Sequence, residues 1–274
     1  MSTATATAPS PTSAPVAQGK VTQLRVLNSE WIKLRTLRST PITLLVAVAA
    51  EVGLGILVTY LRASHPRHGG VEHINGAELS LAMYRLAQLA VGVLGVLIIS
   101  GEYTTGMIRA SLSAVPKRLP VLWAKAAVYG AVLLVLMTIA SLAAFYGGQA
   151  VLSSYGQAAH MSDPGVTRVV FGTALYLTVI GLLGVATGAL IRNSAGAIAA
   201  LFGVLLVLPG LADLLPATWV PNVVPYLPSK AGEALLNVVP DPSLMSPWNG
   251  FALFVGYAVV LLAAAAVLLK RRDA

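Results

Sequence analysis

Six long apolar runs, separated by polar segments, dominate the pattern of hydrophobic and polar positions along this chain. A helix that crosses a bilayer needs about 20 apolar residues. The runs are rich in Leu, Val, Ala and Gly and lack the alternation of a membrane-barrel strand, so we expect helices, which satisfy their own backbone polar groups. The predicted spans are approximately Ile42–Leu61, Leu79–Ser100, Val121–Tyr146, Val169–Ile191, Ala195–Ala212 and Phe251–Leu269.

Two different segments precede the first span. Residues 1–20 are rich in Ala, Thr, Ser and Pro and cannot bury enough apolar surface to order themselves, which predicts a disordered cytoplasmic tail. Residues 21–40 repeat apolar side chains such as Leu24, Leu27 and Trp31 at helical spacing, with most charged residues elsewhere on the helical wheel. This pattern predicts an amphipathic helix that lies in the inner membrane interface.

The segment 213–249, between spans five and six, carries seven prolines with short apolar stretches between them. A fully solvated loop would be more polar. We therefore expect a broken helical segment that dips into the outer interface, where irregular backbone is tolerated against protein. The predicted fold class is an all-α integral membrane protein, with one six-span domain over residues 41–272.

Composition and charge agree with this pattern and add an orientation. The chain is 57% hydrophobic and 10% charged, against about 25% charged residues in a soluble domain. Most of its 18 Lys and Arg lie before span one, between spans two and three, between four and five, or after six. Cationic segments stay inside, so we expect a multi-pass protein of the cell membrane with both termini cytoplasmic. The net charge of +8 then reflects orientation and contact with membrane lipid, and no nucleic-acid partner is expected.

The search for catalytic or metal chemistry is mostly negative. The sequence has no cysteine, no HExxH and no GxSxG pattern. His65, His68 and His73 fit no zinc spacing, which favours a solvated loop. Gly101 and Gly106 have the spacing of a phosphate loop, but the Lys and the Ser or Thr that should follow are missing. We expect neither an enzyme nor a cofactor in this chain.

Two polar residues within the spans are candidates for a translocation path, Glu51 and Gln88. A charged carboxylate at mid-membrane costs at least about 2.5 kcal/mol, so Glu51 should face the bundle or a wet cavity, or be protonated. It could serve a substrate path or a proton relay, or it could simply make a neutral helix–helix hydrogen bond. Gln88 is a possible hydrogen-bond partner.

The stretch from Gly101 to Lys125 is more organised than a simple connection requires. Glu102 stands where span two should leave the membrane, and the residues up to Gly106 can redirect the chain. Residues 107–114 can form a short helix with Met107 and Leu112 on its apolar side, and two prolines follow. The alternative is a long cytoplasmic loop with no function beyond its charge.

The pattern Glu-Tyr-x-x-Gly-x-Ile-Arg-x-x-Leu from Glu102 to Leu112, then Pro-x-Arg and Lys125, resembles the first intracellular loop of type-2 ABC exporter permeases. The order of elements, with an N-terminal interface helix, six spans and a broken external segment, is similar too. The stretch Tyr226–Glu233 also resembles a recurrent segment of such permeases from actinobacteria. The resemblance covers about residues 21–272.

This resemblance implies a coupling helix, within a loop over residues 101–120, that docks on a separate ATPase. Glu102, Gly106 and Arg109 match the loop signature, and Met107 and Leu112 belong to the helix that would make the contact. Met107 departs from the Thr that is common after the glycine. The family further implies that ATP and Mg bind to the ATPase, that a second copy or a paralogue completes the pathway, and that the cargo is exported.

Two other functions remain open from the sequence. A gradient-driven secondary transporter could use Glu51, although no internal repeat of the kind found in such carriers is evident. A sensor or immunity subunit that does not transport could use the same scaffold.

Overall fold

The computed structural model describes residues 22–37, 39–65, 75–106, 119–212, 214, 216 and 218–271. These residues form helices and no strand, and six helical segments are long and apolar enough to cross a membrane. All six predicted spans are confirmed. Each helix begins one to four residues before its predicted run, because the residues that precede the run also adopt helical conformation. The segments are Ser39–Ser64, Gly76–Thr104, Leu119–Ser153, Val166–Ile191, Ser194–Ala212 and Pro247–Arg271.

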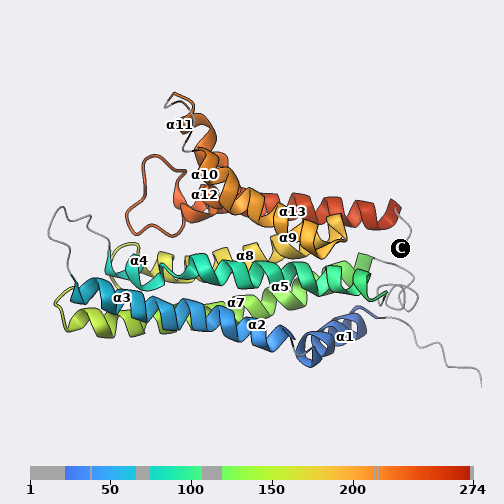
Figure 1. The fold of residues 1–274 in the computed structure, drawn as a ribbon, viewed down its shortest axis with the longest axis horizontal. Coiled ribbons are helices and arrows are strands. Elements are labelled where there is room, and N and C mark those ends of the chain that lie inside the picture. Colours follow the sequence, from blue (N-terminus) through green and yellow to red (C-terminus); the bar gives the residue numbers. More distant parts are fainter. Residues whose placement is uncertain are drawn as a thin grey trace, which may run out of the picture.

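Three spans are single helices and three are interrupted (Figure 1). Two interruptions are π-helical turns, which often mark functional positions. The third is a turn that divides span two. In chain order the spans are α2 (Ser39–Val48), η1 (Ala49–Leu54) and α3 (Gly55–Ser64); α4 (Gly76–Leu81) and α5 (Tyr84–Thr104); α7 (Leu119–Ser153); α8 (Val166–Ile191); α9 (Ser194–Phe202), η2 (Gly203–Val207) and α10 (Leu208–Ala212); and α13 (Pro247–Arg271).

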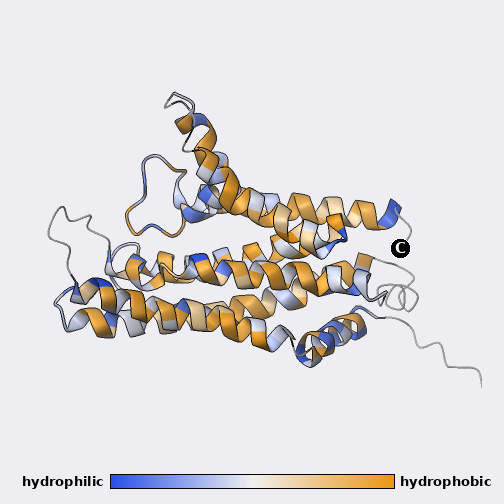
Figure 2. Cartoon of the chain, viewed as in Figure 1, coloured by the Kyte–Doolittle hydropathy of each residue, from blue (hydrophilic) through white to orange (hydrophobic). Residues whose placement is uncertain are grey.

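Helix α8 is the centre of the bundle. In its most apolar stretch 78% of the residues are buried, against 28% in spans one, five and six. The outer faces of the bundle remain apolar, as Figure 2 shows by colour, and Val135 on α7 is 63% exposed. Such surfaces are unfavourable in water and suit a hydrocarbon environment, which agrees with the membrane assignment.

Helices α5 and α8 cross with their backbones in contact. A Cβ atom at Gly95 would lie 2.3 Å from the carbonyl oxygen of Gly181, and one at Gly184 would lie 2.5 Å from that of Gly92. Small residues permit such close approach in membranes, where no hydrophobic effect drives helices together. The GxxxG pair of Gly184 and Gly188 therefore packs within this chain.

Helix α1 (Gln23–Thr36) lies at the end of the bundle where α5 and α13 also end. We call this the α1 end, and the opposite one the far end. Val26, Glu30 and Leu34 form the buried face of α1, whereas Leu24 and Trp31 are exposed. A helix is present within the predicted range, over Gln23–Thr36, but its charged residues do not all point away from the protein. Its position in the membrane interface stays a prediction.

The segment between spans five and six contains short helices, as predicted: α11 (Val220–Val223), the 3₁₀ turn η3 (Val224–Tyr226) and α12 (Pro228–Glu233). Each has a proline in its first two positions, where the missing N–H costs little. Helix α12 packs between α8 and α13, since a Cβ atom at Gly232 would lie 2.7 Å from the Tyr176 ring and 2.8 Å from that of Phe254. The segment is thus part of the packed domain.

Several predictions concern residues outside those described. They are the disordered tail over residues 1–20, the short helix with Met107, Arg109 and Leu112, and most of the loop with His68 and His73.

The α5–α8 crossing yields a stability test. We expect Gly95→Ala to lower the thermal unfolding midpoint of the detergent-solubilised protein, because overpacking a tight contact costs about 1–3 kcal/mol. Gly256→Ala on α13 is the matched control, since a Cβ atom there meets nothing within 4 Å. Equal midpoints for the two variants would contradict the crossing.

Candidate functional site

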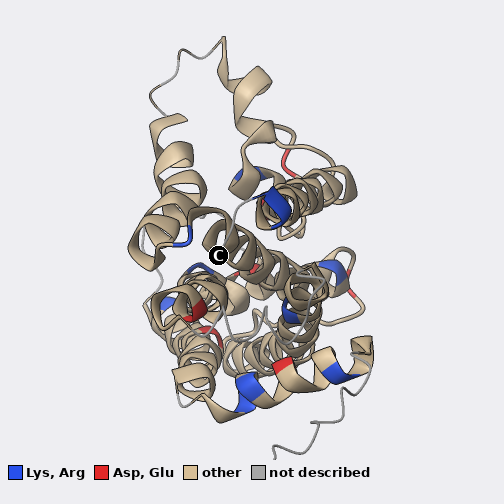
Figure 3. Cartoon of the chain, turned by 90° about the vertical axis from the view of Figure 1, so that its right-hand side faces the viewer, with Lys and Arg blue, Asp and Glu red and all other residues tan. Residues whose placement is uncertain are grey.

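Three helices meet at the α1 end through charged side chains. Glu30 and Lys33 come from α1, Glu102 from the last turn of α5, and Lys125 from the second turn of α7. We call these four residues the ion cluster. Figure 3 shows α1 lying across the bundle, with charged residues where it crosses the helix ends. The side chains of Glu30, Glu102 and Lys125 are only 4–5% exposed, and that of Lys33 is 27% exposed.

The cations and carboxylates of the ion cluster alternate. Lys125 Nζ lies 2.5 Å from Glu30 Oε2 and 2.9 Å from Glu102 Oε1. Lys33 Nζ lies 2.8 Å from Glu30 Oε1 and 3.0 Å from the same Glu102 oxygen. Each ammonium thus donates to both carboxylates, and the cluster is neutral as a whole.

Neutrality makes this burial tolerable. Removing a charge from water costs several kcal/mol, and only close opposite charges and hydrogen bonds offset that cost. A buried pair of this kind adds little net stability compared with apolar residues. It does make the arrangement specific, because separating Glu30, Glu102 or Lys125 from its partners leaves a buried charge with little water to solvate it. The ion cluster therefore fixes how α1, α5 and α7 meet.

The titration of Lys33 reflects this environment. Burial would by itself lower the pKa of its ammonium, but the hydrogen bonds and charges of Glu30 and Glu102 outweigh burial and raise the pKa above the ordinary 10.5. Lys33 is therefore fully charged at neutral pH. Its contribution to stability is present below that ordinary pKa and is lost only as the pH rises through the higher folded value.

Helix α5 ends immediately after the ion cluster. Thr105 N–H donates to the carbonyl of Gly101, and Gly106 adopts a left-handed φ of 72° that a side chain would disfavour. The prediction that these residues terminate the span is confirmed. Glu102 Oε2 is buried and accepts no hydrogen bond from the described part of the chain.

The other flank of α5 is attached to the α8–α9 turn. Ser100 Oγ lies 2.8 Å from Ser194 Oγ, and the Arg192 guanidinium carbon lies 5.0 Å from the centroid of the Tyr103 ring. Asn193 caps α9 by accepting the Gly196 N–H. The last turn of α5 is thus held on both sides, by the ion cluster and by this turn.

The two candidate path residues are buried but lie in separate contacts. Glu51, in η1, is fully buried and accepts a hydrogen bond from Ser141 Oγ on α7 at 2.6 Å, while its other oxygen has no partner among the described residues. Gln88 Oε1 instead accepts the hydroxyl of Tyr176 at 2.8 Å. The suggested pairing of Glu51 with Gln88 was wrong, because each is hydrogen-bonded to a different helix.

Sequence reasoning missed three members of the ion cluster. Glu30 lies four residues from both Val26 and Leu34, so the three share one face of α1. A charged residue on a face that is otherwise apolar indicates an ion-pair partner inside the protein. Lys125 lies inside an apolar run, which is costly without a counter-ion. The pairing itself needs the three-dimensional approach of α1 to α5 and α7. Among the described residues, no group of three or more His, Asp or Glu is placed to hold a metal ion.

Comparison with protein families gives one match that covers most of the chain. A family model described as ABC-2 family transporter protein matches residues 74–274. That range begins just before α4 and includes Glu102, Gly106 and Lys125. No curated protein matches the sequence significantly.

The ion cluster can be tested by removing one charge. We expect Lys125→Met to destabilise the protein by about 3–5 kcal/mol, because two buried carboxylates lose a shared cation. Adding Glu102→Gln should recover part of the loss, as seen in the thermal midpoint in detergent. Lys230→Met, which breaks a partly exposed pair with Glu233, is the control and should cost less than about 1 kcal/mol. An equal cost for the two lysines would contradict the role of the ion cluster.

Proposed function

The chain belongs to the ABC-2 family of transporter proteins, and on this basis we propose that it is the permease subunit of an ABC exporter, driven by a separate ATPase. The family assignment makes it a membrane transport subunit. The direction of transport, the coupling to ATP and the partner are the proposal.

The observation that carries the coupling is the position of the ion cluster. Residues 107–118 connect α5 to α7, and both flanks of that connection contribute to the cluster, Glu102 before it and Lys125 after it. Their carboxylate and ammonium lie 2.9 Å apart, and both bind α1 through Glu30 or Lys33. A force applied to the connection would therefore reach three helices as one unit. A docking element for an ATPase requires such a rigid link between the connection and the helices that it moves.

We infer that Met107, Arg109 and Leu112 supply the contact with the ATPase, as the loop signature implies. ATP and Mg would bind to the ATPase, which would dimerise and move two permease subunits, either identical copies or paralogues. The α1 end would face the cytoplasm, and the cell membrane would hold the protein. Rigid-body motion of the two bundles would then alternate access.

A gradient-driven carrier is the second candidate, and Glu51 favours it. A fully buried carboxyl group with one oxygen unpartnered among the described residues, in a π-helical turn, is a feature of proton-binding sites as well as of helix packing. The hydrogen bond from Ser141 gives it a structural role in either case.

Gly106 provides the test of coupling. Proline cannot adopt its φ of 72°, so Gly106→Pro should redirect the start of the connection at a cost of at least about 1 kcal/mol while the six spans remain folded. We expect permease-dependent ATP hydrolysis to fall severalfold in proteoliposomes that hold the variant and its co-purified ATPase. Gly101→Ala is the control, because a Cβ atom there meets nothing within 4 Å. Failure of the wild-type chain to bind any ATPase would count against the proposed function.

Glu51→Gln separates the two candidates. A neutral amide keeps the hydrogen-bonding capacity toward Ser141 and cannot exchange a proton. An ATP-driven exporter should keep most of its permease-dependent ATP hydrolysis, whereas a proton-coupled carrier should lose gradient-driven accumulation. Ser141→Ala controls for loss of the hydrogen bond alone. Loss of ATP hydrolysis in Glu51→Gln, but not in Ser141→Ala, would show that the carboxyl group of Glu51 does more in an exporter than accept the hydrogen bond from Ser141.

A further inference from the structure

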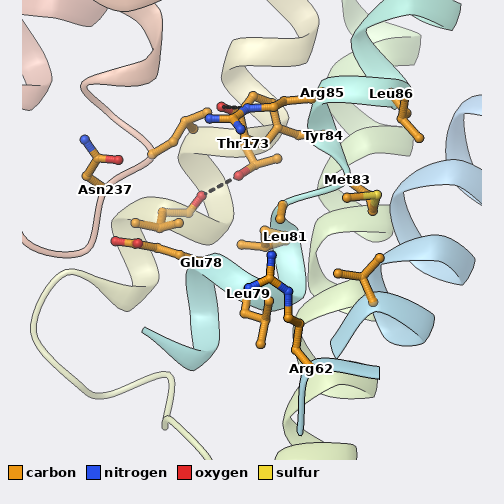
Figure 4. Close-up of a pocket in the computed structure, with 14 residues that line it drawn as sticks. Arg62, Glu78, Leu79, Leu81, Met83, Tyr84, Arg85, Leu86, Thr173 and Asn237 are labelled. Carbon is orange, nitrogen blue, oxygen red and sulfur yellow. Dashed lines mark hydrogen bonds between the residues drawn. The ribbon is translucent and has the colours of Figure 1, made fainter. Parts of the chain in front are cut away.

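A cavity of about 560 Å³ opens at the far end, where span two is divided between α4 and α5. Its walls come from α3, α4, α5 and α8 and from the segment after α12 (Figure 4). The division arises at Ala82 and Met83, which form a turn between the end of α4 and the start of α5 and line the cavity. A volume of this size accommodates a small-molecule ligand or a lipid head group.

The wall of the cavity is held by hydrogen bonds and is preformed. Glu78 Oε1 accepts the N–H of Val238, which joins α4 to the segment after α12. Arg168 Nη2 donates to the carbonyls of Asn237 and Val238 at 2.7 and 3.0 Å. The arginine and the carboxylate therefore fix the backbone beside the cavity, and Glu78 has part of its hydrogen-bonding capacity committed to structure.

The lining carries more cations than carboxylates. The lining holds two arginines, Arg62 and Arg85, and one acid, Glu78, while the charge of Glu233 on α12 acts on Arg85 from outside the lining. Arg85 Nε donates to Tyr84 Oη at 3.2 Å, and its guanidinium carbon lies 5.6 Å from the centroid of that ring. Arg62 makes no hydrogen bond or ion pair with any other described residue, and Figure 4 shows it extending from α3 toward Leu79 and Leu81. Five guanidinium donors are therefore available at the cavity.

Most of the remaining lining is apolar and includes Val58, Leu79, Leu81, Met83, Leu86 and Leu236, whereas Thr173 and Asn237 are polar. Arg62 is exposed at the mouth of this open, partly apolar cavity, so its guanidinium can reach an anionic group while the apolar part of the same molecule contacts the wall. A guanidinium group beside an apolar wall is complementary to a molecule with an anionic head group and a hydrocarbon tail.

We propose that this cavity binds an amphipathic anion, with its phosphate or carboxylate group on Arg62 and its apolar part along α4 and α5. Arg85 lies on the opposite side of the site, where it is engaged with Tyr84 and balanced in part by Glu233, so Arg62 is the principal anion-binding group. Glu78 disfavours a second anionic group at its own end and so orients the ligand. The site does not depend on coupling to ATP, because every residue in the argument lies at the far end, away from the ion cluster.

Site-directed photo-cross-linking tests the proposal on the purified full chain. Met83 is replaced by p-benzoylphenylalanine, and the protein is placed in nanodiscs of equimolar phosphatidylcholine and phosphatidylglycerol. The same photoreactive residue at Val135, which is 63% exposed on α7, reports general lipid contact. We expect phosphatidylglycerol to be cross-linked in preference to phosphatidylcholine from position 83, and no such preference from position 135.

Two charge variants provide the decisive comparison. Arg62→Gln should reduce the phosphatidylglycerol adduct at position 83 about tenfold, the effect expected for one charge-assisted hydrogen bond. Lys270→Gln, an exposed cation in the last turn of α13, should leave the adduct unchanged. Equal adducts of the two lipids at position 83 would overturn the proposal. So would an unchanged adduct in Arg62→Gln with an unaltered thermal midpoint.

Competition with inorganic phosphate identifies the source of the anion. Loss of the adduct on addition of phosphate would show that the head-group chemistry suffices and that a soluble phosphate can occupy the site. Persistence of the adduct would show that the apolar part contributes and that the membrane supplies the ligand. Both results support the site on Arg62, and neither involves an ATPase, so the proposed function is tested separately.

Discussion

Charges that are removed from water must be neutralised where they stand, and this constraint organises the α1 end. Glu102 and Lys125 are almost fully buried, and neither has bulk water to solvate it. Glu30 and Lys33 complete the alternation of charge, so α1 is required for the burial of the other two. The ion cluster thereby adds directional contacts to the apolar packing of Val26 and Leu34.

The membrane explains why the α5–α8 crossing depends on close backbone contact. Lipid is as apolar as leucine, so helices associate through packing and internal hydrogen bonds. At the α5–α8 crossing, Gly95 and Gly184 leave no side chain between the helices. Tyr129 adds a hydrogen bond from its hydroxyl to the carbonyl of Val91 at 2.6 Å. Helix α5 is therefore tightly held along its length.

The sequence was sufficient for the spans and for the broken helical segment between spans five and six, because run length and proline spacing are local properties. It was also sufficient for the end of α5 at Gly106, where a glycine followed the last turn. The ion cluster required contacts between residues 95 positions apart, such as Glu30 and Lys125, which no local pattern specifies. The predicted pairing of Glu51 with Gln88 was wrong for the same reason. The rotation of each span about its axis decides which neighbouring helix its polar residue meets.

Helix α5 connects the two polar regions of the molecule. Its first turn carries Tyr84 and Arg85 at the far-end cavity, and its last turn carries Glu102 in the ion cluster. A helix that is packed backbone to backbone has little room to deform, so a displacement at one end is transmitted to the other rather than absorbed. Under the proposed coupling, movement of Glu102 would shift Arg85 relative to Arg62, which stands on a different span. The division at Ala82 and Met83 would then act as the joint at which the cavity changes shape.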